Sequence, residues 1–109
     1  MFSAVVVGAT SAQASESDCP GSRVCLWNDG NYTNGVKILS GSTTQLPDFH
    51  DLMASWKNSY STQDAKWFYD NNYSGTQRCM NSTSKNPYVG YADNNELDSV
   101  AIYYNNTIC

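Results

Sequence analysis

Four cysteines and one histidine supply the most reactive side chains of this 109-residue chain. Cys19 and Cys25 flank a Pro-Gly turn, whereas Cys79 lies much further along and Cys109 is the last residue. Four cysteines allow three disulfide pairings, and the turn favours a local bridge between Cys19 and Cys25, which leaves Cys79 with Cys109. We therefore predict two disulfides, and neither a thiolate nucleophile nor a cysteine-based zinc site.

His50 is the single histidine, and Asp48 and Asp51 are the acidic residues beside it. A nucleophile, a base and an orienting group would have to be assembled around it. The sequence contains no nucleophile elbow and no Gly-rich phosphate loop. A lone histidine in a polar turn is typical of an exposed or capping residue, so we predict that the protein is not an enzyme.

An eight-residue pattern that occurs twice indicates how the chain positions these groups. Trp27–Asn34 (WNDGNYTN) returns 41 residues later as Phe68–Gly75 (FYDNNYSG). Both copies place an aromatic residue, then an Asp, a Tyr, a hydroxyl residue and finally Asn or Gly. Asn and Gly tolerate left-handed backbone well, so each copy predicts a strand that folds over into a hairpin. The motif residues are Trp27, Tyr32, Asn34, Phe68, Tyr73 and Gly75.

A second shared element follows each hairpin. Phe49–Trp56 precedes Asp93–Val100 by 44 residues, which aligns Asp51 with Asn95 and Ser55 with Ser99. We predict that each serine hydrogen-bonds the folded-over hairpin of its own repeat. The chain is thus interpreted as two copies of a unit of about 40 residues, the first at about 19–60 and the second at about 61–109.

The apolar pattern favours short strands rather than long helices. No stretch keeps a 3.6-residue period over three turns, and the best helical candidate, Asp48–Lys57, would form two turns at most. The predicted strands, separated by Gly, Asn, Asp and Pro, are Arg23–Asn28, Val36–Leu39, Ser55–Tyr60, Ala65–Tyr69, Gln77–Asn81 and Ser99–Tyr104. They predict an all-β sandwich to which each repeat contributes one four-stranded Greek key.

The beginning of the chain predicts export. Residues 1–14 hold a short apolar run that is followed by an A-x-A cleavage site, typical of a signal peptide. The usual preceding Lys or Arg is missing, so we predict a signal peptide that is truncated at its start. An apolar first strand is the alternative. Cleavage would leave residues 15–109 as one secreted domain, and the run is too short to span a bilayer. A net charge of −4 without a basic cluster argues against a nucleic-acid partner.

The repeated motifs resemble the βγ-crystallin signature, in which two Greek keys pack as a sandwich. The resemblance rests on the aromatic-x4-Tyr-x-Gly hairpin and on the Asn/Asp-rich element that ends in Ser about twenty residues later. The second hairpin matches in full, and Asn34 replaces the Gly in the first. With the leader, the early cysteine pair and Val24–Trp27 (VCLW), the chain more specifically resembles peptidase inhibitor family I36 from Cys19 to about Tyr103.

The crystallin resemblance implies Ca²⁺ as a candidate ligand. Its sites combine the Asn/Asp-rich element of one repeat with a hairpin acid of the other. Carried over to this sequence, the ligands are Asn94, Asn95, the Glu96 carbonyl, Asp98, Asp29 and Asp70. The first element departs from the pattern, because His50 replaces Asn or Asp and Ala54 has no ligand atom. The alternative is that these residues serve the architecture alone.

The inhibitor resemblance implies a monomer that blocks an extracellular metallopeptidase with a disulfide-constrained loop. Two segments are constrained in this way: the loop between Cys19 and Cys25, and the polar stretch 80–91 that follows Cys79. Exposed tyrosines could add contact surface or simply pack, and the candidates are Tyr60, Tyr88, Tyr91, Tyr103 and Tyr104. The alternatives are a calcium-binding structural or stress module without a protease target and, less favoured, a small secreted toxin.

Overall fold

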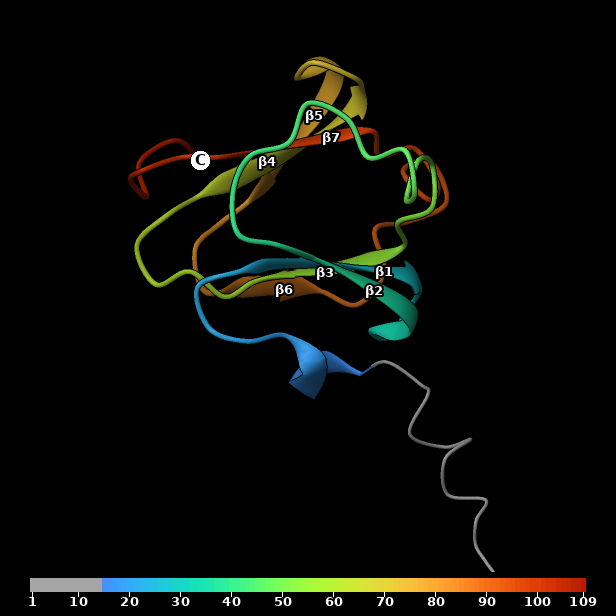
Figure 1. The fold of residues 1–109 in the computed structure, drawn as a ribbon, viewed down its shortest axis with the longest axis horizontal. Coiled ribbons are helices and arrows are strands. Elements are labelled where there is room, and N and C mark those ends of the chain that lie inside the picture. Colours follow the sequence, from blue (N-terminus) through green and yellow to red (C-terminus); the bar gives the residue numbers. More distant parts are fainter. Residues whose placement is uncertain (1–14) are drawn as a thin grey trace, which may run out of the picture.

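Two β-sheets pack face to face in the computed structural model, which describes residues 15–109 (Figure 1). The first sheet has the strand order β2-β1-β3-β6 and the second the order β5-β4-β7. The strands of the first sheet are β1 (Val24–Asp29), β2 (Thr33–Leu39), β3 (Ser55–Asn58) and β6 (Ser84–Asn86). Those of the second are β4 (Ala65–Asp70), β5 (Ser74–Met80) and β7 (Ser99–Ile102). The predicted all-β sandwich is confirmed.

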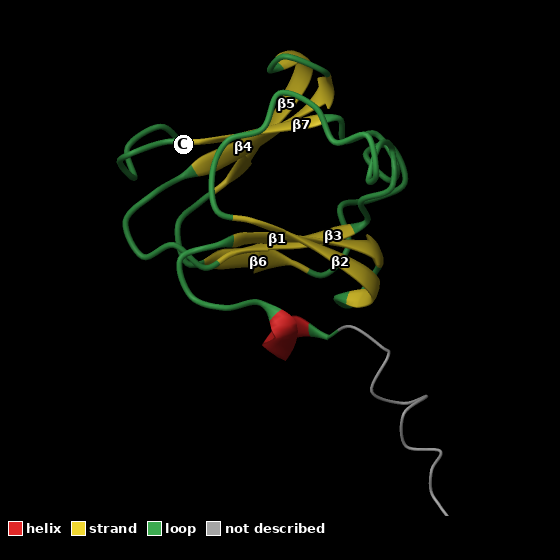
Figure 2. Cartoon of the chain, in the orientation of Figure 1, coloured by secondary structure: helices red, strands yellow, loops and turns green. Residues whose placement is uncertain are grey.

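Helical structure in the described residues is limited to one 3-10 turn, η2 (Glu16–Asp18), drawn in red beneath the first sheet in Figure 2. The Asp48–Lys57 segment contains turns and then β3, so the helical alternative for this segment is wrong. The predicted signal peptide lies outside the described residues.

The two repeats exchange strands. β6 belongs to the second repeat but pairs with β3 of the first, with Trp56 opposite Asn86. In the other direction Thr43 of the first repeat forms a bridge to Val100 of β7, with N–H to carbonyl distances of 2.8 and 3.1 Å. The predicted pair of Greek keys is confirmed, with one strand segment of each repeat passed to the other sheet: the second repeat contributes β4, β5, β7 and the exchanged β6, and the first contributes β1, β2, β3 and the bridge at Thr43.

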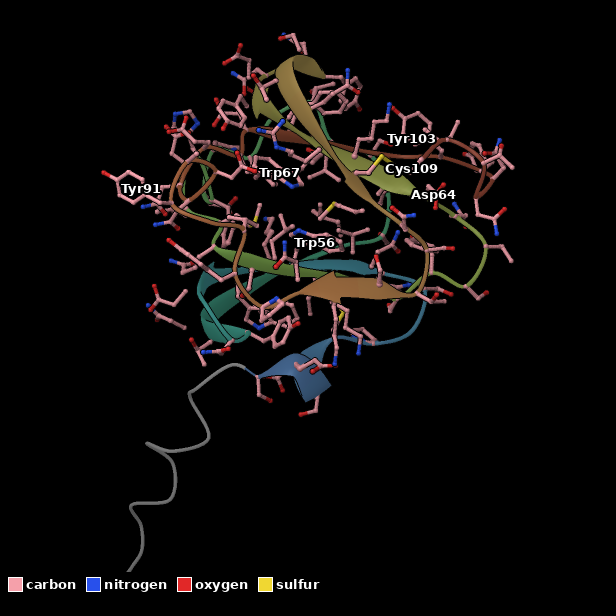
Figure 3. All side chains as sticks on the ribbon, turned by 180° about the vertical axis from the view of Figure 1, so that it is seen from behind. Trp56, Asp64, Trp67, Tyr91, Tyr103 and Cys109 are labelled. Carbon is pink, nitrogen blue, oxygen red and sulfur yellow. A yellow bond between two sulfur atoms is a disulfide. The ribbon has the colours of Figure 1, made fainter. Side chains whose placement is uncertain are left out.

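Every second residue of the strands faces inward, and these side chains fill the space between the two sheets. Val24 and Leu26 of β1 pair with Asn58 and Trp56 of β3, and Trp67 of β4 lies opposite on the second sheet. Figure 3 shows Trp56 and Trp67 pointing into the interior from the two layers. These apolar side chains are at least nine-tenths buried, so the period of two along each strand accounts for the core.

Both hairpins fold over the outer face of their own sheet. Asn34 and Gly75 have φ angles of 61° and 79°, in the left-handed region that their residue types favour. The two residues before the hydroxyl residue are left-handed as well, including Tyr32 and Tyr73 at 58° and 57°. Tyr32 then packs edge-on against Trp27, with ring centroids 5.2 Å apart. Trp27, Tyr32 and Phe68 are buried, whereas Tyr73 keeps 38% of its surface exposed.

Ser55 and Ser99 fix these strained turns. The Ser55 hydroxyl donates to the Asp29 carbonyl at 2.7 Å and accepts the Tyr32 N–H at 3.1 Å. Ser99 makes the matching bonds to Asp70 at 2.6 Å and from Tyr73 at 3.1 Å. A left-handed aromatic residue persists only where its surroundings hold it, and the predicted serine bonds are confirmed as that restraint.

Two disulfides close the chain, one from Cys19 to Cys25 and one from Cys79 to Cys109. These are the pairs that the sequence favours. Asp64 adds a second attachment for the segment that ends at Cys109, and Figure 3 shows the two residues close together. The buried Asp64 carboxylate accepts the N–H groups of Ser82, Ile108 and Cys109 at 2.9, 3.2 and 3.1 Å.

Replacing Asp64 by asparagine should lower the free energy of unfolding at pH 7 by about 2 kcal/mol, because an amide nitrogen cannot accept those N–H groups. The Ser82, Cys109 and Ile108 N–H groups hold the pKa of Asp64 below its ordinary value, although burial opposes them. A carboxyl with a lowered folded-state pKa stabilises the fold above its unfolded pKa, and that stability is lost as the pH falls through the folded-state pKa.

Urea unfolding of the parent and of Asp64→Asn at pH 7 and pH 3 measures how much of the free energy of unfolding each protein loses in acid. The parent should lose more stability in acid than the variant does. Equal losses in both proteins would show that Asp64 does not carry the acid sensitivity.

Candidate functional site

Two loops, one from each repeat, pair with each other between the ends of the sheets. The Asp51 N–H donates to the Leu97 carbonyl and the Asn95 N–H donates to the Met53 carbonyl, both at 3.0 Å. Asp51 and Asn95 also share a left-handed backbone, with φ angles of 55° and 65°. The second shared sequence element therefore forms a nearly symmetric joint between the repeats.

Three side chains that could bind a cation meet at this joint: His50, Asp51 and Asp98. Each offers a donor atom that lies within 4.8 Å of the others, and they are the only such group of three among residues 15–109. His50 Nδ1 is 2.5 Å from Asp98 Oδ1, and His50 Nε2 is 3.2 Å from Asp51 Oδ2. The imidazole thus lies between two carboxylates that come from different repeats.

Asp98 is the buried member of this group, with 8% of its surface exposed. Burial raises the pKa of Asp98 first, and the neighbouring Asp51 carboxylate raises it further, while His50 acts in the opposite direction. A positive charge placed here would stabilise both carboxylates.

The other residues of the calcium hypothesis lie apart from this group. Asp29 accepts a hydrogen bond from Asn34 at 3.0 Å within its own hairpin. Asp70 lies against Gly75 in the second hairpin. Glu96 and the two asparagines belong to the paired loop, but Asp29, Asp70 and Glu96 do not join His50, Asp51 and Asp98 in a cluster of ligand-bearing groups in the described part of the chain.

A second polar network that the sequence did not reveal holds the far end of the same loop. Tyr69 donates to Asp93 Oδ1 at 2.6 Å, and Arg78 Nε donates to Asp93 Oδ2 at 2.9 Å. Burial opposes ionisation of Asp93, yet the hydrogen bonds from Arg78 and Tyr69 lower its pKa overall. The network fixes the start of the Asn/Asp-rich element against β4 and β5.

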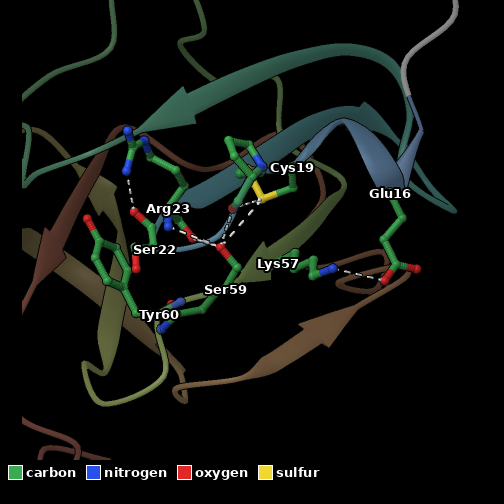
Figure 4. Close-up of a disulfide and its surroundings, with 10 residues drawn as sticks. Glu16, Cys19, Ser22, Arg23, Lys57, Ser59 and Tyr60 are labelled. Atoms are coloured by element: carbon green, nitrogen blue, oxygen red, sulfur yellow. Dashed lines mark hydrogen bonds and ion pairs between the residues drawn. A yellow bond between two sulfur atoms is a disulfide. The ribbon is translucent and has the colours of Figure 1, made fainter.

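The Cys19–Cys25 loop is the first constrained segment on the surface (Figure 4). Ser59 fixes this loop with two hydrogen bonds: its hydroxyl donates to the Pro20 carbonyl at 2.6 Å and accepts the Arg23 N–H at 3.0 Å. Beside the loop, Glu16 lies between the ammonium groups of Lys57 and Lys85, and the pKa of Glu16 is lowered first by Lys85 and then by Lys57. This surface is therefore polar and rigid.

The second constrained segment, 80–91, is anchored along its length. Near its start, Ser82 donates to Asp64 and the Thr83 N–H donates to the Tyr60 carbonyl at 3.0 Å. Towards its end, the Val89 N–H donates to the Ala54 carbonyl at 2.9 Å. Tyr91 then projects from the body of the molecule, with 93% of its surface exposed (Figure 3).

The tyrosines that the sequence left open divide into two groups. Tyr60 is buried and donates to the Ser40 carbonyl at 3.0 Å, so it packs. Tyr103 is half-buried, and Tyr88, Tyr91 and Tyr104 are exposed. Tyr88 and Tyr91 lie at the end of the second constrained segment and Tyr104 follows β7, so none of the exposed tyrosines belongs to the Cys19–Cys25 loop.

The sandwich, the folded hairpins and the paired loops define a βγ-crystallin-type domain. A βγ-crystallin domain from Clostridium beijerinckii is 28% identical, with a TM-score of 0.65 over 74% of this chain and 97% of that one. A domain from work on the evolution of the eye lens βγ-crystallin fold is 17% identical, with a TM-score of 0.70 over 77% and 88%. A βγ-crystallin from Ciona intestinalis is 22% identical, with a TM-score of 0.63 over 72% and 96%.

Within that class the chain belongs to peptidase inhibitor family I36, whose model matches residues 12–82. The match includes the first repeat, the hairpin of the second and the start of the segment that follows Cys79. A comparison with curated proteins finds no match. In the described residues, helices long and apolar enough to cross a membrane are absent.

Proposed function

We propose that this protein is a secreted, non-enzymatic inhibitor of an extracellular peptidase, and specifically of a metallopeptidase. Membership of family I36 supports the inhibitor role, and proteins of this family are typically extracellular. The inhibitor acts as a monomer that blocks the active-site cleft with a constrained surface segment.

The observation that carries this proposal is the anchoring of segment 80–91. Cys79 is tied to Cys109, Ser82 to Asp64, and Val89 to Ala54, so a surface segment is held at both ends while its side chains, except the buried Met80, stay at least partly accessible. A segment that is already ordered loses little conformational entropy when it enters a cleft, and this keeps binding tight.

The exposed aromatic residues favour segment 80–91 over the Cys19–Cys25 loop. Tyr88 and Tyr91 offer large amphipathic surfaces that bind partners well, and both are exposed. The Cys19–Cys25 loop presents only small residues at its tip, Pro20 and Gly21. It is the second candidate for the contact.

The test is a titration of the oxidised protein, residues 15–109, against a thermolysin-like metalloprotease. We expect activity to fall in proportion to added protein and to vanish near a 1:1 ratio. The assay is run in saturating Ca²⁺ and with EGTA, because such proteases themselves need calcium, and a serine protease is the control for class. No inhibition at micromolar concentration would overturn the proposal.

Prolonged incubation of the complex should also map the contact. We expect slow cleavage within segment 80–91, with the two fragments held together by the Cys79–Cys109 disulfide until they are reduced. Mass spectrometry before and after reduction locates the bond. Cleavage between Cys19 and Cys25 would instead assign the contact to the first loop.

A calcium-binding structural module is the second candidate function. It is favoured by the two carboxylates, Asp51 and Asp98, that converge where the repeats meet. If it holds, Ca²⁺ should raise the melting temperature relative to EGTA, and Asp98→Ala should fold but lose that rise. A rise that survives in the variant would place the calcium site elsewhere.

A further inference from the structure

The joint between the repeats combines one imidazole nitrogen with two carboxylates, a donor set that transition metals accept more readily than calcium does. We propose that His50, Asp51 and Asp98 bind a borderline divalent cation such as Zn²⁺, with one imidazole nitrogen and two carboxylates as ligands. The proposal is independent of peptidase inhibition.

The unsatisfied carboxylate oxygen of Asp98 points to a missing partner. Asp98 Oδ1 is buried and has no well-aligned hydrogen-bond donor; its close neighbour is His50 Nδ1 at 2.5 Å, which neutralises the carboxylate only when the imidazole is protonated. Buried polar atoms are paired in nearly all native structures, and an unpaired carboxylate oxygen is costly. A cation would give this oxygen its partner and would reduce the repulsion between the two carboxylates.

The chemistry of the donors selects the type of cation. Ca²⁺ takes six to eight oxygen ligands, whereas Zn²⁺ accepts imidazole nitrogen together with carboxylate oxygen in a four-coordinate site. His50 brings a nitrogen into the group, and Ala54, the counterpart of Asp98 in the first repeat, has no side-chain oxygen. Three protein ligands and a water would complete tetrahedral coordination.

The geometry requires only small side-chain movements. Donor atoms around a tetrahedral Zn²⁺ lie about 3.3 Å apart, given bonds of about 2.0 Å, and the three donors here already lie within 4.8 Å of one another. The side chains of His50 and Asp51 are 55% and 48% exposed, so they are free to adjust around the fixed Asp98. The bound ion would join the loop of one repeat to the loop of the other.

The experiment is calorimetric titration of the oxidised, EDTA-treated protein with ZnCl₂ and, separately, with CaCl₂. We expect one Zn²⁺ per chain and tighter binding of Zn²⁺ than of Ca²⁺. His50→Asn should weaken Zn²⁺ binding at least 100-fold, and Asp98→Asn should do the same. Asp48→Asn is the matched control, because Asp48 is a nearby exposed acid that pairs with Lys37, and it should leave binding unchanged.

A second readout uses the fact that His50 is the only histidine in the chain. Its imidazole resonances in NMR spectra should shift on addition of Zn²⁺ and stay unchanged on addition of Mg²⁺. The proposal is overturned if Zn²⁺ does not bind at millimolar concentration, if His50→Asn binds it as the parent does, or if Ca²⁺ binds more tightly than Zn²⁺.

Discussion

Replacing Gly75 by valine should destabilise the fold severely, with a loss of about 4 kcal/mol in the free energy of unfolding. Gly75 has a φ of 79°, where a β-branched residue is a severe outlier. A Cβ at this position would also collide with the Asp70 carboxylate, whose Cγ would lie only 2.9 Å away. Since small domains are stable by only about 5–15 kcal/mol, the thermal transition should move far down or disappear.

Two further variants separate the causes of that loss. Gly41→Val is the matched control, because Gly41 has no heavy atom near its Cβ position and no left-handed φ, so its melting temperature should stay close to that of the parent. Gly75→Asn should cost less than half as much as valine, because Asn34 occupies the equivalent turn at a φ of 61° and donates to Asp29. If Gly75→Val melts like the parent, this account of the hairpin is wrong.

Loss of the Cys79–Cys109 disulfide has the second largest expected effect. In the chain-entropy model, closing a loop of this length stabilises the fold by about 3.7 kcal/mol, against about 2.4 kcal/mol for the short Cys19–Cys25 loop. The double variant Cys79→Ala/Cys109→Ala should therefore show a lower urea midpoint than the parent. When the protease slowly cleaves this variant within segment 80–91, the two fragments should separate without reduction.

The double variant Cys19→Ala/Cys25→Ala serves as the comparison, although Cys25 is buried beside Trp27 and its loss removes some packing. Below both melting temperatures, the variant without Cys79–Cys109 should inhibit the metalloprotease less well, because segment 80–91 loses its anchor. Equal inhibition by both variants would show that the disulfide stabilises the fold without ordering the contact segment.

The features that sequence reasoning located are those with a local signal. The hairpins are predicted by an aromatic residue, a tyrosine and an Asn or Gly at fixed spacing. The hydrogen-bonding roles of Ser55 and Ser99 are predicted by the alignment of the two repeats. The strands could be placed because their apolar residues alternate or cluster between turn residues. These signals depend on neighbours within a few positions along the chain.

The features that sequence reasoning missed depend on residues far apart. β6 is a polar stretch, Ser84–Asn86, and it is a strand only because β3 offers it an edge. Asp64 is indistinguishable from a surface acid until Ser82, Ile108 and Cys109 converge on it. The contact between His50 and Asp98 joins different repeats, although the alignment of Asp51 with Asn95 indicated that the two loops are equivalent.

The strand exchange between the repeats has a consequence for the order of folding. Neither sheet has its full complement of pairings until the other repeat has contributed β6 or Thr43. Pairings between distant parts of a chain form slowly, because loop-closure entropy is lost before the contacts compensate for it. The two halves are therefore expected to refold together in one slow phase, and a half expressed alone would expose an unpaired sheet edge that invites aggregation.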